Sequence, residues 1–182
     1  MKNFPLLFLS ILASLVLNAQ DKSNIKFGKI SAADFLISSP VIDSNANAVV
    51  IADIGSSEFE GNNTGWFSLV YKRVRRIKII NQNGLDAGNT IITLFKDNGY
   101  YQDTKDKEVL LDLKGSTYNL ENGNVVETKL DAKSVFENRI DKNWLEKKFT
   151  MPAIKAGSII EYSYTIKSDF LFNLQPWRSE ER

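Results

Sequence analysis

The densest group of chemically capable side chains is a basic run in the middle of the chain. Five cations lie close together there, at Lys72, Arg73, Arg75, Arg76 and Lys78. Such a cluster is a candidate for contacting the phosphates of nucleic acid. Neighbouring residues of a β-strand point to opposite faces, so the run divides into Arg73 and Arg75 on one face and the other three cations on the opposite face. We therefore expect a solvated strand face whose cations pair with carboxylates across the sheet, and no binding of nucleic acid.

A second cluster consists of carboxylates in the polar stretch that follows a predicted strand, at Asp97, Asp103, Asp106 and Glu108. Calcium accepts carboxylate oxygens as ligands. Calcium loops, however, place these ligands at fixed alternate positions around a central glycine, and this stretch lacks that spacing. We expect a solvated loop, no metal site and no cofactor.

Three aromatic side chains lie in or beside predicted loops, at Trp66, Tyr100 and Tyr101. Aromatic rings with a polar edge stack on sugars and peptides, so these residues form a candidate ligand surface. Packing in the core or at its rim explains them equally well.

Covalent catalysis is restricted by what the sequence lacks. The chain contains no cysteine and no histidine. A cysteine nucleophile and a histidine-assisted serine are therefore excluded. A hydrolase that uses two carboxylates stays open as an alternative, because Asp and Glu are plentiful, but no specific pair stands out. We expect a protein that is not an enzyme.

The first 19 residues have the organisation of a secretory signal peptide. Lys2 supplies the basic start, an apolar run extends from Phe4 to Leu17, and Ala19 precedes a polar stretch. The apolar run is shorter than the roughly 20 residues that a membrane-spanning helix requires. We predict cleavage between Ala19 and Gln20, a periplasmic or secreted product, and no stable membrane span after cleavage. An uncleaved anchor is the alternative, because Leu17 is bulky for a position two before the cut.

The expected mature chain, residues 20–182, is electrically neutral. The sequence has 23 Lys and Arg against 22 Asp and Glu, and the leader holds one lysine, which leaves 22 of each. A neutral surface does not attract nucleic acid or anionic membranes in general. The length and ordinary composition predict one globular domain, and without cysteine its stability must come from the core.

Short strands punctuated by Asn, Gly and Asp dominate this domain. The patterns predict a short helix opened by Ser31 and Asp34, a loop over Gly55 to Gly65, and a turn needing positive φ at Asn83-Gly84. A helical turn is expected after Asp131, because Phe136, Ile140 and Trp144 keep a step of four. Strands are predicted over Ala48 to Ile54, Trp66 to Ile80, Thr90 to Phe95, Glu108 to Leu120, Val125 to Leu130, Trp144 to Met151 and Ser158 to Lys167.

Two of these features are the clearest. Tyr118 and Val125 lie on opposite arms of a hairpin with an Asn-Gly turn. In the last strand, apolar and aromatic side chains alternate on one face, at Ile160, Tyr162, Tyr164 and Ile166. The predicted fold class is mainly β, an antiparallel β-sandwich with one or two short helices.

The hairpin and the last strand also carry a family resemblance. The runs Lys114 to Leu130 and Lys147 to Trp177, with Asn45 to Phe59 and Val74 to Gly84, resemble the N-terminal domain of unknown function of exported bacterial transglutaminase-like proteins. The resemblance implies a β-rich module that precedes and supports a transglutaminase-like catalytic domain, which this chain does not reach. It also implies partners: a transglutaminase-like domain, or an envelope peptide or glycan.

The family continues with further strands after its tryptophan, whereas here Trp177 is followed by five mostly charged residues. From this we expect a domain that is incomplete at its C-terminal end, with the last strand left as an unpaired edge that favours self-association. The functional hypothesis is an exported non-catalytic module. The alternatives are a nonfunctional truncated remnant and the carboxylate-based hydrolase.

Overall fold

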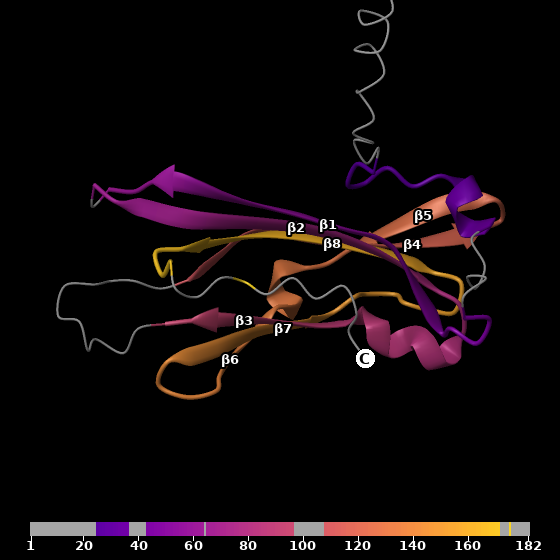
Figure 1. The fold of residues 1–182 in the computed structure, drawn as a ribbon. Coiled ribbons are helices and arrows are strands. Elements are labelled where there is room, and N and C mark those ends of the chain that lie inside the picture. The colour runs from indigo at the N-terminus through magenta and orange to yellow at the C-terminus, as the bar shows by residue number, and fades with distance from the viewer. Residues whose placement is uncertain (1–24, 37–42, 64, 97–107, 172–174, 176–182) are drawn as a thin grey trace, which may run out of the picture.

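Two antiparallel sheets stack face to face in the computed structural model (Figure 1), which describes residues 25–36, 43–63, 65–96, 108–171 and 175. The predicted fold class, an antiparallel β-sandwich with short helices, is confirmed. The helical elements of the described residues are 3-10 turns: η2 (Ala32–Leu36), η3 (Gln82–Gly88) and η4 (Ala132–Ser134).

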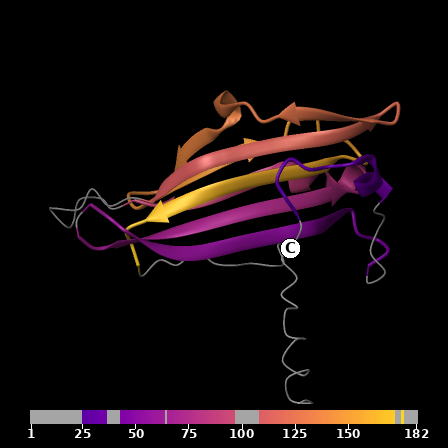
Figure 2. The same ribbon diagram turned by 90° about the horizontal axis from the view of Figure 1, so that it is seen from above.

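The larger sheet has five strands in the order β1-β2-β8-β4-β5, and Figure 2 shows them side by side from above. β1 and β2 form one long hairpin, and β4 and β5 form another. β8, which is last in sequence, lies between the two hairpins and hydrogen-bonds to both. The strands are β1 (Ala48–Gly61), β2 (Phe67–Ile79), β4 (Val109–Glu121), β5 (Asn124–Lys129) and β8 (Ile159–Ser168).

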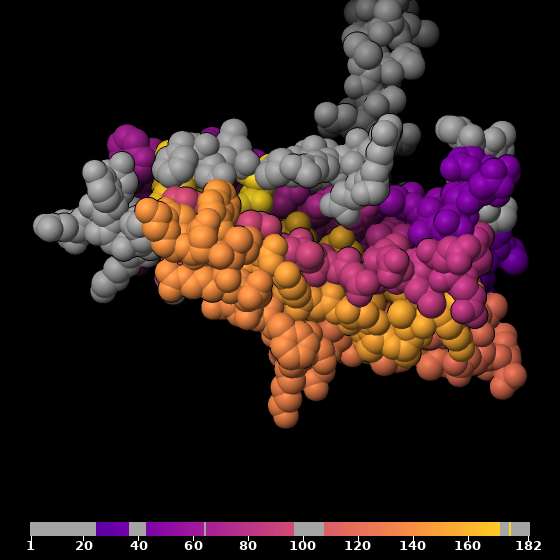
Figure 3. All heavy atoms as spheres, turned by 90° about the horizontal axis from the view of Figure 1, so that it is seen from below, coloured from indigo at the N-terminus to yellow at the C-terminus, as the bar shows by residue number. Residues whose placement is uncertain are grey.

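The smaller sheet has three strands in the order β3-β7-β6, namely β3 (Asn89–Phe95), β7 (Trp144–Thr150) and β6 (Phe136–Arg139). Figure 3 views this side of the molecule: the magenta segment of η3 and β3 runs beside the orange β6 and β7. β3 and β6 are the edge strands of this sheet.

The core lies between the two sheets and follows the alternation of their strands. The predicted face of β8 is confirmed, because Ile160, Tyr162, Tyr164 and Ile166 are all buried in the main hydrophobic cluster. Side chains from the smaller sheet pack against them, among them Phe149, whose ring meets that of Tyr162 edge to face at 5.8 Å. Burying this apolar area is the main source of stability for a chain without disulfides.

The expectation that the last strand is an unpaired edge is wrong. β8 pairs with β2 on one side and with β4 on the other, so its backbone groups are occupied across the sheet. Phe170, just beyond it, is buried and packs edge to face on Phe95 at 4.7 Å. Self-association through this strand therefore loses its physical basis. Trp177 lies outside the described residues.

The predicted loop over Gly55 to Gly65 is also wrong in its first half. β1 continues to Gly61, because the neighbouring β2 supplies backbone partners as far as Phe67. Polar and small residues are poor strand formers alone, but pairing with an existing strand overrides this preference. β1 is an edge strand, and the half-exposed Val50 shows that it is not the buried strand expected from its β-branched residues.

Two local expectations were met only in part. The turn after Asp131 is η4, but the residues that follow it form β6, which pairs with β7. The step of four from Phe136 to Trp144 therefore does not mark a helix. The helix opened by Ser31 is the 3-10 turn η2, in which the Asp34 carboxylate accepts hydrogen bonds from both the amide and the hydroxyl of Ser31.

Candidate functional site: an arginine-lined cavity between the sheets

A hollow lined by described residues lies on the inner face of the larger sheet, beside the edge of the smaller one. Its volume is about 570 Å³, which falls within the range of small-molecule and peptide pockets. Its floor contains Arg73 and Arg75 from β2 and Tyr162 and Tyr164 from β8. Residues of β1, η3 and β3 form the walls, among them Val50, Gly84 and Ile91.

The strand register places the floor side chains next to each other. Arg75 lies opposite Asp53 of β1 on one side and opposite Tyr162 of β8 on the other, and Arg73 lies opposite Tyr164. Residues opposite each other in an antiparallel pair share a face and touch. The site is therefore a row of polar side chains that crosses three strands within an otherwise apolar layer.

Asp53 links the two arginines. Nε and Nη2 of Arg73 donate to its two carboxylate oxygens at 2.8 and 2.6 Å, which is the bidentate geometry that guanidinium favours. Arg75 Nε lies 3.6 Å from one of the same oxygens. The hydrogen bonds that Arg73 donates to Asp53 raise the pKa of Arg73 further above its already high value. Arg73 therefore stays charged at any ordinary pH.

The tyrosines complete the floor. The Tyr164 hydroxyl is hydrogen-bonded to Arg73, and Arg75 Nη1 donates to the Tyr162 hydroxyl at 3.4 Å. The rings of Tyr162 and Tyr164 lie almost parallel, with centroids 6.4 Å apart. Burial raises the pKa of Tyr164 to about 12, so its hydroxyl is a neutral donor at physiological pH. The floor thus offers hydrogen-bond donors on planar guanidinium and phenol groups.

The predicted division of the basic run between two faces is confirmed, but the predicted solvation is confirmed for Lys72 alone. Arg73 and Arg75 face the cavity, and Arg76 and Lys78 face the outside of the sheet, yet all four are buried. Pairing with carboxylates across the sheet is confirmed for Lys72, Arg73 and Arg76, whose partners are Glu58, Asp53 and Glu161. Burial follows because neighbouring elements cover both faces of β2.

The rim on the η3 side is set by a close backbone approach. A Cβ on Gly84 would lie 2.1 Å from the carbonyl oxygen of Asn47, so only glycine fits there. The expected turn with positive φ at Asn83-Gly84 is therefore wrong: the segment is η3, capped by the Asn81 side chain, which accepts from the amide of Asn83 at 2.9 Å. This packing brings the exposed Asp86 to the cavity rim.

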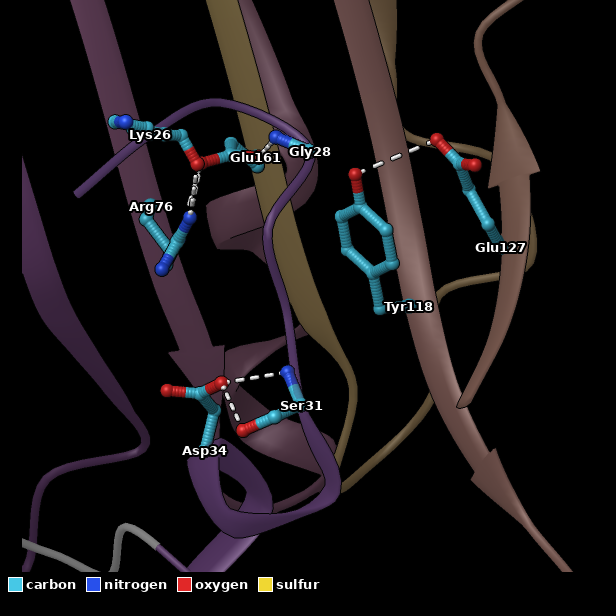
Figure 4. Close-up of polar contacts among 8 residues, drawn as sticks. All are labelled: Lys26, Gly28, Ser31, Asp34, Arg76, Tyr118, Glu127 and Glu161. Carbon is cyan, nitrogen blue, oxygen red and sulfur yellow. Dashed lines mark hydrogen bonds and ion pairs between the residues drawn. The ribbon is translucent and has the colours of Figure 1, made fainter. Parts of the chain in front are cut away.

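The outer face of β2 holds a second polar cluster, which binds the N-terminal segment of the domain (Figure 4). Glu161 is fully buried and accepts from Nε and Nη2 of Arg76 at 3.0 and 2.7 Å. Its other oxygen accepts from the amide of Gly28 at 2.7 Å, and Arg76 also donates to the carbonyl of Lys26. This cluster is satisfied within the chain, so we assign it a structural role: it fixes residues 25–36 to the sheet.

Lys78 adds to this attachment. Its ammonium group donates to the carbonyls of Gly157 and Phe35 at 2.7 and 3.3 Å and lies 4.7 Å from the centroid of the Phe35 ring. Burial lowers the pKa of Lys78.

The predicted ligand surface does not coincide with the cavity. Trp66 is 62% exposed and lies at the loop of the β1–β2 hairpin, at the other end of these strands from the cavity wall at Ala48. Tyr100 and Tyr101 lie outside the described residues, as do Asp97, Asp103 and Asp106. A role for these aromatic residues in binding therefore stays a prediction.

Glu108, the described member of the acidic cluster, is buried and accepts a hydrogen bond from the amide of Phe95 at 2.7 Å. Within the described ranges, no three acidic side chains come together in a way that would hold a metal ion. None of the helical turns in these ranges is long and apolar enough to cross a membrane.

The sequence analysis missed Asp53, Tyr162 and Tyr164 as site residues. One signal was present in the sequence. Arg73 and Arg75 lie an even number of positions from Tyr71, Ile77 and Ile79 in the same strand, so they share a face with these core residues. Two arginines on the apolar face of a strand predict a buried polar site. Their carboxylate partner, by contrast, depends on the register of another strand.

Comparisons with known proteins add little to this geometry. No protein-family model matches the chain, and no curated protein is significantly similar to it. A solved structure described as that of "a putative protease" from Parabacteroides distasonis has 15% sequence identity over 68% of this chain, with a TM-score of 0.47. The chain spans 23% of the length of that protein. The resemblance to the transglutaminase-associated family stays a prediction, and the function has to be argued from the site.

Proposed function

We propose that this protein is an exported, non-catalytic β-sandwich module that binds a peptide or glycan of the cell envelope in the cavity between its sheets. In longer proteins of the family that it resembles, the same module supports a neighbouring transglutaminase-like domain. The observation that carries the proposal is the cavity itself. Its floor is polar, and the charged groups there hold one another in place.

The chemistry of the lining favours binding over catalysis. Both oxygens of Asp53 accept hydrogen bonds from Arg73, so this carboxylate is not placed to take a proton from a substrate. A hydrolase of the two-carboxylate type needs one group as acid and the other as base or nucleophile, on either side of the bond that is cut. Among the described residues, the carboxylate beside the floor is that of Asp53, and Arg73 occupies both of its oxygens. Preorganised guanidinium and phenol donors are suited to recognition.

Retention on cell-envelope material tests the proposal. The purified protein is incubated with sedimented envelope polymer, and the bound fraction is measured beside a turnover assay with fluorogenic peptides and glycosides. We expect saturable retention and no turnover above that of buffer. Turnover that disappears on substitution of a single Asp or Glu would replace the proposal with the hydrolase alternative, and failure to bind any envelope fraction would remove it.

Export is proposed on the leader alone and has its own measurement. Mass spectrometry of the protein from fractionated cells should find a mature N-terminus at Gln20 in the periplasmic or extracellular fraction. An intact Met1 in the cytoplasmic fraction would contradict this.

A further inference from the structure

β1 is an edge strand of the larger sheet and lies along one margin of it (Figure 2). It has 14 residues, whereas β5 at the other edge has 6. Within the described ranges, β1 pairs with β2 and with no other strand. Its pairing with β2 shifts register between Val50 and Ala52 and is then continuous from Ala52 to Gly61. A long edge strand presents main-chain donors and acceptors to which another strand can hydrogen-bond.

The regular part of β1 has few of the features that protect a sheet edge. Proteins commonly protect such edges with proline, with charged residues, lysine above all, or with a bulge. The run from Ala52 to Gly61 contains no proline, lysine or arginine. Its carboxylates pair with cations of neighbouring strands: Asp53 with Arg73, Glu58 with Lys72, and Glu60 with Lys167. Another strand can therefore pair here without meeting a carboxylate that lacks a cation.

Exposed apolar side chains accompany this edge. Phe59 in β1 is 64% exposed, and Trp66, in the loop that follows β1, is 62% exposed. Asn62 holds Trp66 in place, because its side-chain oxygen accepts from the amide of Trp66 at 2.9 Å and its own amide donates to the carbonyl of Trp66 at 2.8 Å. Large apolar side chains gathered on an ordered surface are typical of protein interaction sites.

We propose that a second copy of this chain covers this edge, with the two β1 strands paired antiparallel about a two-fold axis at Ser57. Two copies of one segment can pair in this way, because a two-fold interface brings the same surface of both subunits together. An axis at Ser57 uses the regular run from Asp53 to Gly61, and it joins the two larger sheets into one continuous sheet. The inference goes beyond the proposed binding function and does not depend on it.

The side chains select this register from its neighbours. Residues opposite each other in an antiparallel pair share a face and touch. With the axis at Ser57, Phe59 of each copy lies over Gly55 of the other, where the missing side chain leaves room for the ring. An axis one residue later would set the two Glu58 side chains against each other, and an axis one residue earlier would set Phe59 against the charged Asp53.

The pairing also brings each copy to the cavity of the other. In this register, the residues that follow Gly61 lie beside those that precede Asp53 in the second copy. The Trp66 loop of one copy therefore approaches Val50 of the other, which lines the cavity and is 43% exposed. Each subunit thereby adds an aromatic side chain beside the cavity wall of its partner.

Single cysteines test the pairing, because the chain has no cysteine of its own. Residues directly opposite in antiparallel strands have Cα atoms about 4.5 to 5.5 Å apart, within the range of a disulfide, whereas diagonal neighbours lie about 7 to 8 Å apart. Ser57→Cys, oxidised with dilute copper phenanthroline, should form a disulfide-linked dimer at least ten times faster than Ser56→Cys. Val126→Cys, a half-exposed position on the opposite edge strand β5, should be equally slow. Equal rates for the three variants, or faster linkage of Ser56→Cys, would overturn the proposed pairing.

A charge at the axis tests the same contact without a cross-link. Sedimentation equilibrium of the unmodified protein should show a monomer and a dimer in exchange. Ser57→Lys sets two ammonium groups opposite each other, and like charges in this position are destabilising. It should raise the dissociation constant at least tenfold, whereas Val126→Lys on β5 should leave it unchanged. Both positions are exposed, so the variants keep the fold, which circular dichroism checks. An unmodified protein that stays monomeric, or a dimer insensitive to Ser57→Lys, would remove the inference.

Discussion

The buried pair of Arg76 and Glu161 should stabilise the domain only as an intact unit. Glu161 Oε1 accepts from Nε and Nη2 of Arg76, and the two side chains are 0% and 5% exposed. Removing one partner of such a pair leaves an uncompensated buried charge, which typically costs about 3 to 5 kcal/mol. We therefore expect Arg76→Met and Glu161→Leu each to lower the free energy of unfolding by about 3 kcal/mol or more. This is a large part of the roughly 5 to 15 kcal/mol of a typical domain.

The double substitution Arg76→Met with Glu161→Leu should cost less than either change alone would suggest. It buries no charge, and its main loss is the acceptor for the amide of Gly28, worth about 1 to 3 kcal/mol. The two single losses sum to about 6 kcal/mol or more, so the double-mutant cycle should show a coupling of about 3 kcal/mol or more.

Urea unfolding followed by tryptophan fluorescence measures these energies, and hydrogen exchange of residues 25–36 shows whether the N-terminal segment is released. The control is Lys72→Ala with Glu58→Ala, a cross-strand pair whose side chains are 51% and 50% exposed, which should leave the free energy of unfolding nearly unchanged. Single losses below about 1 kcal/mol with additive behaviour would refute the reasoning, because they would mean that the pair is hydrated.

Two further predictions concern the cavity and its rim. The pKa of Tyr164 is raised to about 12 from 10, so the folded state holds a proton that the unfolded chain releases in this interval. This group should therefore lower the free energy of unfolding by up to about 2 to 3 kcal/mol as the pH rises from 10 to 12, measured by urea unfolding. Tyr164→Phe should weaken the dependence, and Tyr118, whose pKa is also raised to about 12, should account for part of the remainder. Gly84→Ala should destabilise the domain by about 1 to 3 kcal/mol, measured by thermal unfolding, because the added Cβ meets the carbonyl of Asn47. Gly61→Ala, where nothing lies within 4 Å of the added Cβ, should be nearly neutral. Equal effects of the two substitutions would contradict the close approach at Gly84.

The parts of the fold that the sequence predicts are those decided by neighbouring residues. The β4–β5 hairpin needs positive φ at Asn122 and Gly123, which have φ values of 51° and 81°, and this pair of residues is among the few that adopt them readily. The alternation in β8 similarly predicts its buried face, because one side of a strand must face the core.

The features that the sequence analysis missed depend on distant partners. The second half of β1 is a strand because β2 lies beside it, and β8 is central because two hairpins close around it. Gly84 resembles a turn glycine, yet its constraint comes from Asn47, which a local pattern does not include. For the site, the sequence shows that Arg73 and Arg75 lie on the core-facing side of their strand. It does not show that Asp53 is their partner, because this depends on the register between β1 and β2.

The position of β2 explains how one strand carries buried arginines on both faces. Burying arginines on both faces of a strand costs free energy unless each face receives its own carboxylate. The two carboxylates come from opposite neighbours: Asp53 from β1 for the inner face, and Glu161 from β8 for the outer face. The two faces differ in their surroundings. The outer pair is completed by the backbone of Lys26 and Gly28, whereas Arg73 and Arg75 on the inner face line the cavity. A substitution on the outer face should therefore change stability and the attachment of the N-terminal segment, and one on the inner face should change ligand affinity. The alternation of a single strand thus separates the structural role of Arg76 from the proposed binding role of its neighbour Arg75.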